Sequence, residues 1–390
     1  MVVSGILATP SGYSVAGADG QRQPGCGREL RSAPHTAWGR RMRARRCRGK
    51  AARLAAVCVG SFLLVIYFLY DGLNPASDQL TMPDSWTGKA RAVLGHQPST
   101  IDKQARSDAQ QLHQRRRALL DKACAAQQRQ SRKRRLLTAG DLRHLIVDDQ
   151  HGLLYCYVPK VACTNWKRVM MVLTSAGRYA DPLTIPAHEA HVAANLRTLD
   201  TFPPAEINRR LRHYLKFLFV REPFERLVSA YRNKFTRAYN TAFHRRYGTT
   251  IVRRHRHRPS AEALERGADV SFQEFVWYLV DPKTRRDGPF NEHWETVYSL
   301  CHPCLIRYDV LGHYETLASD ARYLLALARL EPLISFPASA GGPQAGRTTA
   351  AMAAGFFRNI SPFYQRKLYQ LYQLDFALFN YSVPSYLRLG

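Results

Sequence analysis

The chain has 390 residues, which is enough for two domains or for one large domain with a tethering segment. Lysine and arginine total 57 against 30 acidic residues, so the formal net charge is +27. Such an imbalance usually reflects a polyanionic partner, which narrows the partners to nucleic acid, an anionic membrane surface or an acidic polysaccharide.

The first 53 residues predict a basic cytosolic tail. Residues 1–39 are rich in Gly, Ser, Pro and Ala without periodicity, and we expect no regular structure there. Residues 1–53 carry 11 basic and 2 acidic residues, a net of +9, which leaves +18 of the +27 for the rest of the chain. The larger share of the charge therefore lies in the part of the chain that has to form any binding groove.

The next segment, Leu54–Tyr70, is an uncharged stretch of 17 residues, near the lower limit for a transmembrane helix. Several arginines precede this stretch and Asp71 follows it. The positive-inside rule therefore predicts that the amino terminus is cytosolic and that the chain after residue 70 is translocated across the membrane. The alternatives are a buried core helix or a cleaved signal peptide, which would begin nearer the first residue. Short spans are typical of thin membranes, so we expect a single-pass type II protein of the Golgi membrane.

Residues 71–140 are polar and basic, which predicts a lumenal stem with some helix around 105–127. Two basic runs lie in it, at 115–117 and 132–135. These runs fit a solvated helix face at least as well as a polyanion-binding site.

From about residue 141 the chain alternates between apolar, strand-like runs and amphipathic, helix-like stretches. Strands that alternate with helices predict an α/β fold, a parallel sheet with flanking helices on both faces. We assign residues 141–390 to this one domain. The predicted strands are Leu153–Val158, Tyr214–Val220 and Arg307–Leu311, the predicted helices are Asn165–Leu173, Phe224–Phe235, Thr316–Leu330 and Phe363–Tyr381, and Ala338–Gly346 is a predicted loop.

The segment Tyr155–Lys167 has the order strand, tight turn, helix. Such a turn points several backbone N–H groups at one spot, and the helix dipole strengthens their attraction for an anion. Lys160 adds a positive charge at the turn, and Thr164 adds a hydroxyl near the start of the helix. The segment therefore suits a bound phosphate or sulfate, although it lacks the Walker pattern G-x-x-x-x-G-K-[ST] and the lysine alone also fits a solvated loop.

A second segment, Phe217–Arg232, repeats this order. Arg221 stands at the carboxyl end of the strand, Pro223 is placed to start the helix, and Ser229 follows about two turns later. Ligands of open α/β sheets bind just beyond the carboxyl ends of the strands, and the planar fork of arginine suits a phosphomonoester. The segment is a second candidate phosphate site.

Together the two segments resemble the 5′-phosphosulfate loop and the 3′-phosphate motif of sulfotransferases that use 3′-phosphoadenosine-5′-phosphosulfate (PAPS), where the Arg and Ser of the second motif also stand eight residues apart. The stretches V-P-K-V-A-C-T-N-W-K, F-L-F-V-R-E-P-F-E-R-L, P-F-N-E-H-W and F-N-Y-S-V-P-S-Y-L look like the Golgi carbohydrate 4-O-sulfotransferases, specifically the chondroitin 4-O-sulfotransferases. The resemblance runs from about residue 141 to 389. Ala162 and Cys163 replace the Gly and Thr usual in cytosolic relatives, which leaves individual loop contacts open.

The resemblance implies a P-loop-like sulfotransferase fold and in-line transfer of a sulfuryl group from PAPS to a sugar hydroxyl, without a metal or a covalent intermediate. Lys160 would stabilise the charge that grows on the bridging oxygen, and Arg221 and Ser229 would hold the 3′-phosphate. The donor-binding residues that the resemblance implies are Pro159, Lys160, Val161, Ala162, Cys163, Thr164, Asn165, Arg221, Glu222, Pro223 and Ser229.

The acceptor hydroxyl needs a general base, and the sequence offers three candidates. Glu189 and His191 lie between the two motifs, where related enzymes carry their base. His191 is our first choice because imidazole titrates near neutral pH, Glu189 is the second and His293 the third. Each of them also fits a structural or acceptor-positioning role.

The expected acceptor is a chondroitin-type polysaccharide, because a carboxylate on each disaccharide would be drawn to a basic groove in a salt-dependent way. Acceptors such as dermatan, terminal N-acetylgalactosamine or glucuronic acid stay open, because acceptor choice lies in loops. We expect Arg232, Lys234 and His293 to bind the acceptor; Arg237 and the cluster Arg253–Arg258 are further candidates, and the cluster fits a solvated loop equally well.

Five cysteines would lie in the oxidising lumen, where disulfides form. Because five is odd, at least one stays free or pairs between chains. Cys301 and Cys304 have the spacing of half a zinc site without a second pair, so we expect disulfides, with the pairing open. Asn380 and Asn359 begin N-glycosylation sequons, of which the second is weaker because Pro362 follows it. The five cysteines expected in the lumen are Cys124, Cys156, Cys163, Cys301 and Cys304.

Two hypotheses from other functional classes are alternatives to an enzyme. A pI of about 10.1 fits a nucleic-acid-binding protein, but the predicted span and sequons argue against it, and we expect no nucleic-acid partner. A lumenal polysaccharide-binding protein that lost its chemistry is the other, and the presence of Lys160, Arg221 and Ser229 argues against it.

Overall fold

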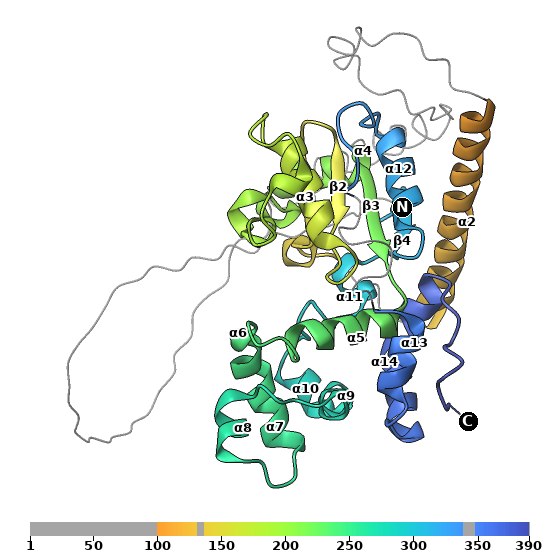
Figure 1. The fold of residues 1–390 in the computed structure, drawn as a ribbon. Helices are drawn as coiled ribbons and strands as arrows, with labels where there is room; N and C mark the ends of the chain where they lie inside the picture. Colours follow the sequence, from red (N-terminus) through yellow and green to blue (C-terminus); the bar gives the residue numbers. More distant parts are fainter. Residues whose placement is uncertain (1–99, 131–135, 338–347, 390) are drawn as a thin grey trace, which may run out of the picture. The chain divides into compact units, whose positions relative to one another are not determined.

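The computed structural model describes residues 100–130, 136–337 and 348–389, and within them four strands form one sheet (Figure 1). The sheet has the order β1-β2-β3-β4, in which β2, β3 and β4 are parallel and β1 is antiparallel to β2. Nearly every strand residue is buried, which explains why the strands read as continuous apolar runs. The strands are β1 Leu145–Asp148, β2 Leu153–Cys156, β3 Leu215–Val220 and β4 Val310–His313.

The sheet is mixed, so our prediction of a parallel sheet was wrong at one edge. β1 and β2 form a hairpin, in whose turn Asp148 Oδ1 accepts hydrogen bonds from the backbone N–H of Gln150 (2.9 Å) and His151 (3.1 Å). Gly152 completes the turn at φ +62°, a conformation that favours glycine. Because β1 is antiparallel, its amino end lies beside the carboxyl end of β2, where Leu145 pairs with Cys156.

Helices cover the sheet at both edges. Helix α3 (Cys163–Thr174) packs against β1, whereas α12 (Leu317–Leu327) and α2 (Thr100–Gln130) pack against β4 (Figure 1). Arg116 of α2 donates to Asp320 of α12 at 2.8 Å, so α2 belongs to the same folded unit as the sheet although it lies within the range of the predicted stem.

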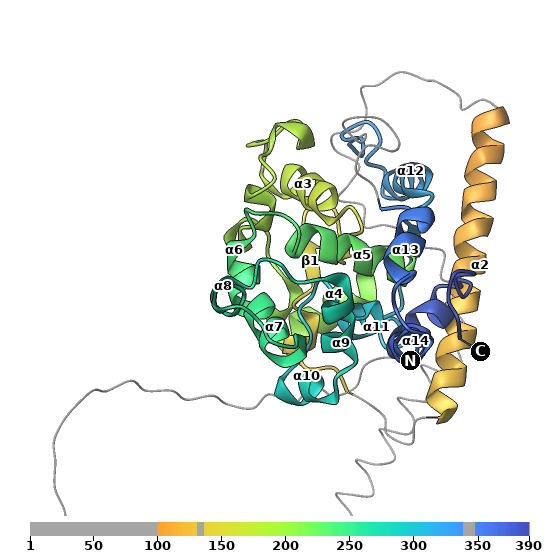
Figure 2. The same cartoon turned by 60° about the horizontal axis from the view of Figure 1, so that its bottom comes forward.

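A second group of helices follows β3 and forms what we call the helical part, residues 223–301 and 348–389 (Figures 1 and 2). Helix α5 (Pro223–Lys234) leads into it from the sheet, with Pro223 at its first position and the Glu222 side chain accepting a hydrogen bond from the N–H of Glu225. Its core is aromatic, and we call it the helical core; it includes Phe224, Tyr231, Phe235, Phe275, Trp294, Phe357 and Phe376.

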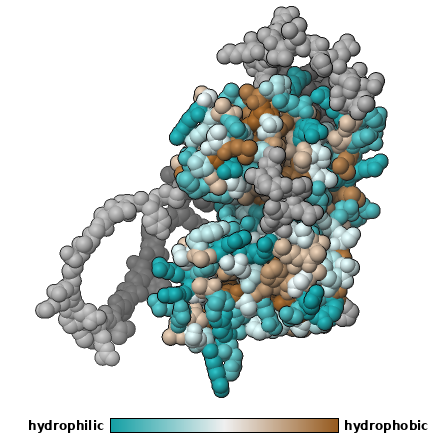
Figure 3. Space-filling model, viewed as in Figure 1, coloured by the Kyte–Doolittle hydropathy of each residue, from teal (hydrophilic) through white to brown (hydrophobic). Residues whose placement is uncertain are grey.

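The sheet has its own core, the sheet core, in which aromatic rings from β2, β3 and α3 meet. The ring of Trp166 lies 5.0 Å from that of Phe217 and 4.9 Å from that of Phe219. These two cores, rather than one, bury the apolar side chains of the domain. Hydrophilic residues dominate the lower margin of the face in Figure 3, where α7 and α8 of the helical part lie.

The predicted strands and helices all exist, with ends shifted by a few residues. The largest shift is at the helix predicted around 105–127, since α2 begins at Thr100; the third predicted strand, Arg307–Leu311, begins three residues later than predicted, at Val310. The predicted loop Ala338–Gly346 lies outside the described residues. The last predicted helix corresponds to α14 Pro362–Leu378. Elements that the sequence did not reveal are β1 Leu145–Asp148, α4 Pro204–His213, α6 Thr241–Phe243, a short π-helix His244–Gly248, α7 Thr249–His255, α8 Ala261–Arg266, α9 Phe272–Val280, α10 Pro282–Asp287, α11 Val297–Cys301, α13 Ala350–Phe357 and short 3₁₀ turns at Ala139–Leu142, Pro182–Thr184, Glu189–His191, Ala193–Asn195 and Leu199–Thr201.

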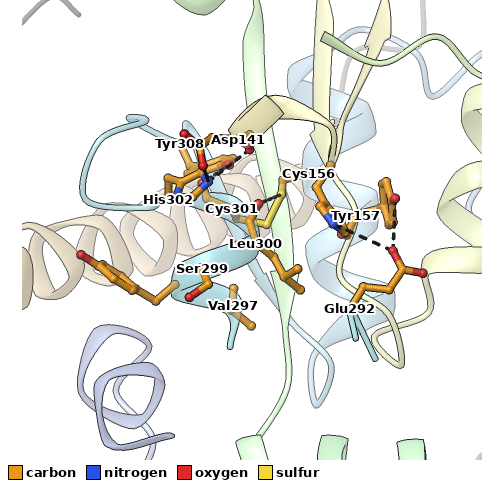
Figure 4. The surroundings of a disulfide bond; sticks show 12 residues. Asp141, Cys156, Tyr157, Glu292, Val297, Ser299, Leu300, Cys301, His302 and Tyr308 are labelled. Carbon is orange, nitrogen blue, oxygen red and sulfur yellow. Dashed lines mark hydrogen bonds and ion pairs between the residues drawn. A yellow bond between two sulfur atoms is a disulfide. The ribbon is translucent and has the colours of Figure 1, made fainter. Parts of the chain in front are cut away.

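Two disulfides cross-link the domain, as we expected from the cysteines. Cys156 at the end of β2 pairs with Cys301 at the end of α11 (Figure 4), and Cys124 of α2 pairs with Cys304. Cys163 is free and buried. Among the described residues, no group of three His, Cys, Asp or Glu side chains is arranged to hold a metal ion.

The predicted tail, the span Leu54–Tyr70 and the first part of the stem lie outside the described residues. In the ranges that the structure does describe, helices of sufficient length and apolar character to cross a membrane do not occur.

Candidate active site

A cavity of about 780 Å³ opens at the carboxyl ends of β2, β3 and β4. Arg143 reaches it from the other edge of the sheet, because the antiparallel β1 presents its amino end there. The lining carries five cations and one carboxylate, so the cavity is built for anions. The charged side chains are Arg143, Lys160, Lys167, Arg221, Lys234 and Glu292.

The turn after β2 forms the floor of the cavity. Lys160 and Ala162 adopt positive φ angles of 72° and 54°, which cost roughly 1–2 kcal/mol each for residues other than glycine. Asn165 and Trp166 both donate to the Ala162 carbonyl, at 3.1 and 3.2 Å. This arrangement leaves the N–H groups of Cys163 and Thr164 without an acceptor in the described part of the chain, at the positive end of the α3 dipole.

Lys160 stands over this turn with its side chain half-buried. Burial is the main cause that lowers the pKa of its ammonium group to about 8; Cys163 opposes this shift, and the neighbouring cations Lys234 and Arg221 contribute to it. The lysine is therefore charged at neutral pH but held in a site that destabilises the charge, which an anionic ligand would reverse.

Arg221 follows β3 and is almost fully buried, with 2% of its side chain exposed. It donates to the carbonyl oxygens of Lys160 (3.5 Å) and Thr348, pairs with Glu225 at 3.3 Å, and lies 4.2 Å from the ring centroid of Tyr314. Ser229 lies two turns along α5 and lines the same cavity. The structure thus brings both predicted phosphate segments to one site.

Four of the predicted donor residues do not line the cavity. Val161 is fully buried in the sheet core, and Pro223 is buried at the start of α5. Asn165 accepts a hydrogen bond from Arg168 at 3.4 Å. Glu222 caps α5, and burial raises the pKa of its carboxyl to about 7. The others, Pro159, Lys160, Ala162, Cys163, Thr164, Arg221 and Ser229, are in the lining.

The three candidate bases are placed differently. His191 lies at the cavity, where its Nε2 is 3.0 Å from the Thr164 hydroxyl. Partial burial, with Lys167, Lys234 and Lys160 nearby, lowers the pKa of His191 to about 4, so its ring is neutral and able to accept a proton. Glu189 accepts a hydrogen bond from Tyr179 at 2.9 Å and is not in the lining. His293 lines the cavity, with its Nδ1 2.7 Å from Asn291 Oδ1.

A cationic, strained turn, a buried arginine and a neutral histidine around one cavity are suited to holding an anionic group and transferring part of it. Comparison with known proteins identifies the class. Residues 143–382, more than half of the chain, match the model of the sulfotransferase family. The chain belongs to the carbohydrate sulfotransferases.

Several curated relatives are similar over most of their length. Carbohydrate sulfotransferase 11 of Rattus norvegicus is 54% identical over 336 residues, which cover 86% of this chain and 94% of the relative. Carbohydrate sulfotransferase 12 of Mus musculus is 40% identical, with coverage of 75% and 74%. Carbohydrate sulfotransferase 8 of Homo sapiens is 41% identical, with coverage of 70% and 63%. No solved structure matches the chain significantly.

Membership in this family makes the protein an enzyme that transfers sulfate to carbohydrate, and it implies a carbohydrate substrate and a sulfate donor such as PAPS. The cavity is therefore the candidate active site of this carbohydrate sulfotransferase.

The predicted acceptor residues of the carbohydrate sulfotransferase are only partly at the cavity. Lys234 and His293 line it, and Arg232 lies behind it, where it donates to the Thr348 hydroxyl at 3.0 Å. Arg237 and the cluster Arg253–Arg258 are not in the lining. In the cluster, Arg254 pairs with Asp287, and Arg256 pairs with Asp269 (2.5 Å) and Glu274 (2.6 Å), so these two arginines are occupied within the helical part.

Sequence reasoning missed four residues of the site. Tyr157 and Lys167 lie inside the first segment and Arg143 precedes it, whereas Glu292 lies in the N-E-H-W stretch from which we chose only the histidine. The signal for Tyr157 and Lys167 was their place inside the strand–turn–helix segment. Arg143 had no signal, because its position depends on the hairpin that we did not predict.

Arg226 is a further residue without a sequence signal. It is 2% exposed and donates to three backbone carbonyls, those of Pro159 (3.0 Å), Glu292 (2.9 Å) and Glu295 (2.6 Å). The first belongs to the turn after β2 and the others to the opposite wall, so Arg226 fixes the two walls of the cavity relative to each other.

Proposed function

We propose that this carbohydrate sulfotransferase transfers a sulfuryl group from PAPS to the 4-hydroxyl of N-acetylgalactosamine in chondroitin. The observation that carries the donor half is the convergence of Lys160, Thr164, Arg221 and Ser229, from two segments about 60 residues apart, on one cationic cavity. The acceptor half is supported by the resemblance of four sequence stretches to chondroitin 4-O-sulfotransferases and by the excess of positive charge in the lining.

The donor roles follow from the chemistry of each group. The free N–H groups of Cys163 and Thr164 and the Lys160 ammonium group would hold the phosphosulfate, and Arg221 with Ser229 would hold the 3′-phosphate. Arg221 is already oriented by Glu225 and Thr348, so little side-chain entropy is lost when an anion binds.

The transfer step uses few groups. The acceptor oxygen forms a bond to sulfur while the bond from sulfur to the bridging oxygen breaks, and Lys160 stabilises the negative charge that appears on that oxygen. His191 takes the proton from the acceptor hydroxyl, since its ring is neutral and lies 3.0 Å from the Thr164 hydroxyl at the donor turn. Glu189 is the weaker candidate for the base because its carboxylate already accepts a hydrogen bond from the Tyr179 hydroxyl. His293 would orient the acceptor.

The site of action that we propose is the Golgi lumen, with the chain anchored by Leu54–Tyr70. The disulfides fit an oxidising compartment, and both sequon residues, Asn359 and Asn380, are exposed. These observations support the location without testing the anchor.

The test is a transfer assay with the purified full-length chain, ³⁵S-labelled PAPS and desulfated chondroitin, followed by disaccharide analysis. We expect label on the 4-position of N-acetylgalactosamine, and a loss of about 100-fold or more in kcat/KM for Lys160→Ala and for Arg221→Ala. Label on another position or glycan alone would overturn the chondroitin assignment. Absence of transfer by a folded, PAPS-binding protein would favour a polysaccharide-binding protein without catalysis.

A further inference from the structure

The cavity has two ends with different surroundings. Toward β3 and β4 lie Arg221, Ser229 and Tyr314, and toward β1 lie Arg143, Ile146 and Thr198, which form one edge of the sheet region. The proposed donor contacts use the first end and the turn after β2. The proposed donor contacts do not use the second end, which we call the β1 wall and define as Arg143, Tyr157, Lys167 and Glu292.

Tyr157 in the β1 wall is held in place by a neighbouring disulfide, a backbone hydrogen bond and a side-chain hydrogen bond. Tyr157 follows Cys156, which is cross-linked to Cys301, and its N–H donates to the His144 carbonyl at 2.9 Å. Its hydroxyl donates to Glu292 at 3.3 Å, and the two side chains meet beside the disulfide in Figure 4. Such a wall is rigid enough to select a ligand by geometry.

Lys167 and Arg143 are the cations of this wall. The Lys167 ammonium nitrogen lies 3.8 Å from the centroid of the Tyr157 ring, and burial lowers the pKa of Lys167, against opposing effects of Cys163 and Glu292. Arg143 extends from the amino end of β1 and is exposed to the cavity. Within the described ranges neither cation has a carboxylate at ion-pair distance, so an anionic ligand would supply the partner that is missing.

The formal charge of the wall limits the ligand. Two cations and the Glu292 carboxylate leave a net charge of +1, which matches a singly charged anion better than a phosphate monoester of charge close to −2. Glu292 also provides acceptor oxygens for sugar hydroxyls, and the Tyr157 ring provides an apolar face. A carboxylated sugar combines these three properties.

We propose that Arg143 and Lys167 form an acceptor subsite that binds a uronate carboxylate of the polysaccharide, an inference that rests on the proposed function. The acceptor would thereby be held at the end of the cavity opposite Arg221, with its hydroxyl directed toward Lys160 and His191. The subsite predicts that the enzyme distinguishes a carboxylated polymer from a neutral one at the catalytic site, and not only through the overall charge of the protein.

The experiment compares two acceptors, desulfated chondroitin and the same polymer with its carboxyl groups reduced to alcohols. For each purified full-length variant, kcat/KM is measured with both polymers and the ratio is calculated. We expect a ratio of about ten or more for the unmodified chain, a ratio several-fold lower for Lys167→Met and for Arg143→Gln, and a ratio near one for the double variant. Affinity for adenosine 3′,5′-bisphosphate, measured by calorimetry, should stay within about twofold and also reports folding.

Two control variants remove a positive charge from the protein surface outside the cavity. Lys283→Met on α10 and Arg212→Gln on α4 lie on exposed surface away from the cavity, and both should keep the original ratio. A ratio unchanged in the double variant, a fall of equal size in the controls, or a loss of nucleotide affinity in the variants would overturn the subsite. Equal transfer to both polymers by the unmodified chain would overturn it while the proposed function stands, whereas transfer to neither would overturn both.

Discussion

The sheet part and the helical part of this domain are stabilised in different ways. Both disulfides have at least one end near the sheet, at Cys156, the last residue of β2, and at Cys304 before β4, and the strands themselves are buried on both faces. In the helical part, as far as the structure describes it, aromatic rings pack around Tyr231, Phe275 and Trp294, and partly buried ion pairs such as Arg256 with Glu274 add to this packing.

This difference indicates which parts of the active site have a rigid geometry and which parts can vary. The donor turn after β2 lies between a disulfide-bonded residue and the start of α3, so its geometry is held by covalent and backbone constraints. The opposite wall, at Asn291–His293, comes from the helical part, whose packing tolerates change more readily than a cross-link does. We therefore expect donor binding to follow the sheet part and acceptor choice to depend on both.

The largest expected effect comes from Arg226, which connects the two parts. Arg226→Met would keep an apolar side chain but leave three buried carbonyls without their donor, and we expect the free energy of unfolding to fall by about 3–5 kcal/mol and activity to be lost. Chemical denaturation and the sulfate-transfer assay measure both. Arg266→Met on the exposed end of α8 is the control, and equal stability of the two variants would contradict a connecting role for Arg226.

The next effect concerns the disulfide that links β2 to the end of α11. Replacing Cys156 and Cys301 together by Ala removes a cross-link between residues 145 positions apart, and we expect a loss of about 2–5 kcal/mol in the free energy of unfolding. Denaturant titration with and without reductant measures it: the original protein should be weakened by reductant, and the double variant less so. A double variant as stable as the original would show that backbone packing alone holds the donor turn.

A smaller effect is expected from pH. Because burial lowers the pKa of Lys160 to about 8, the group loses its charge as the pH rises through that value, well below the range of an ordinary lysine. Above about pH 8, kcat/KM for PAPS should fall up to tenfold per pH unit. In Lys160→Arg, whose side chain stays charged, this alkaline fall should disappear even if the overall rate is lower. An unchanged pH profile in that variant would assign the fall to another group.

The smallest effect is expected from the basic cluster of the helical part. Arg254 pairs with Asp287 on the surface, so Arg254→Gln should change the free energy of unfolding by less than about 0.5 kcal/mol and leave kcat/KM for chondroitin within about twofold. Initial-rate measurements at low salt decide it. A fall of tenfold would show that the long acceptor chain extends over α7, and would make the helical part a second binding surface.

The sequence was most informative where a strand runs directly into a helix. The segments around Lys160 and Arg221 carry their function in contiguous residues, so both were found, and the structure brings them to one cavity. The short strand β1 was not found because three apolar residues followed by a turn at Asp148–Gly152 give no clear period. Arg143 was missed with it, since only the antiparallel hairpin moves this residue to the carboxyl ends of the other strands.

The helical part was hardly predictable for a different reason. Helices α6, α7 and α8 span only three to seven residues each, which is too short for a helical period to show in the sequence. We predicted that the basic cluster Arg253–Arg258 could bind the acceptor because its positive charges are adjacent in the sequence. The carboxylates that pair with Arg254 and Arg256 are 13 to 33 residues away, so this pairing was not apparent. Long-range pairing of this kind is set by packing and not by local pattern.

The spacing of the cysteines also determines when each disulfide can form during translation. When Cys156 leaves the ribosome, its partner Cys301 is still 145 residues from being made, and Cys124 waits for 180 residues. At about 5–20 residues per second this delay is on the order of ten seconds or more, during which both thiols share the nascent chain with Cys163, which is free in the described part of the protein. Because Cys163 is only 9% exposed in the finished domain, folding shields this thiol from exchange with the two disulfides.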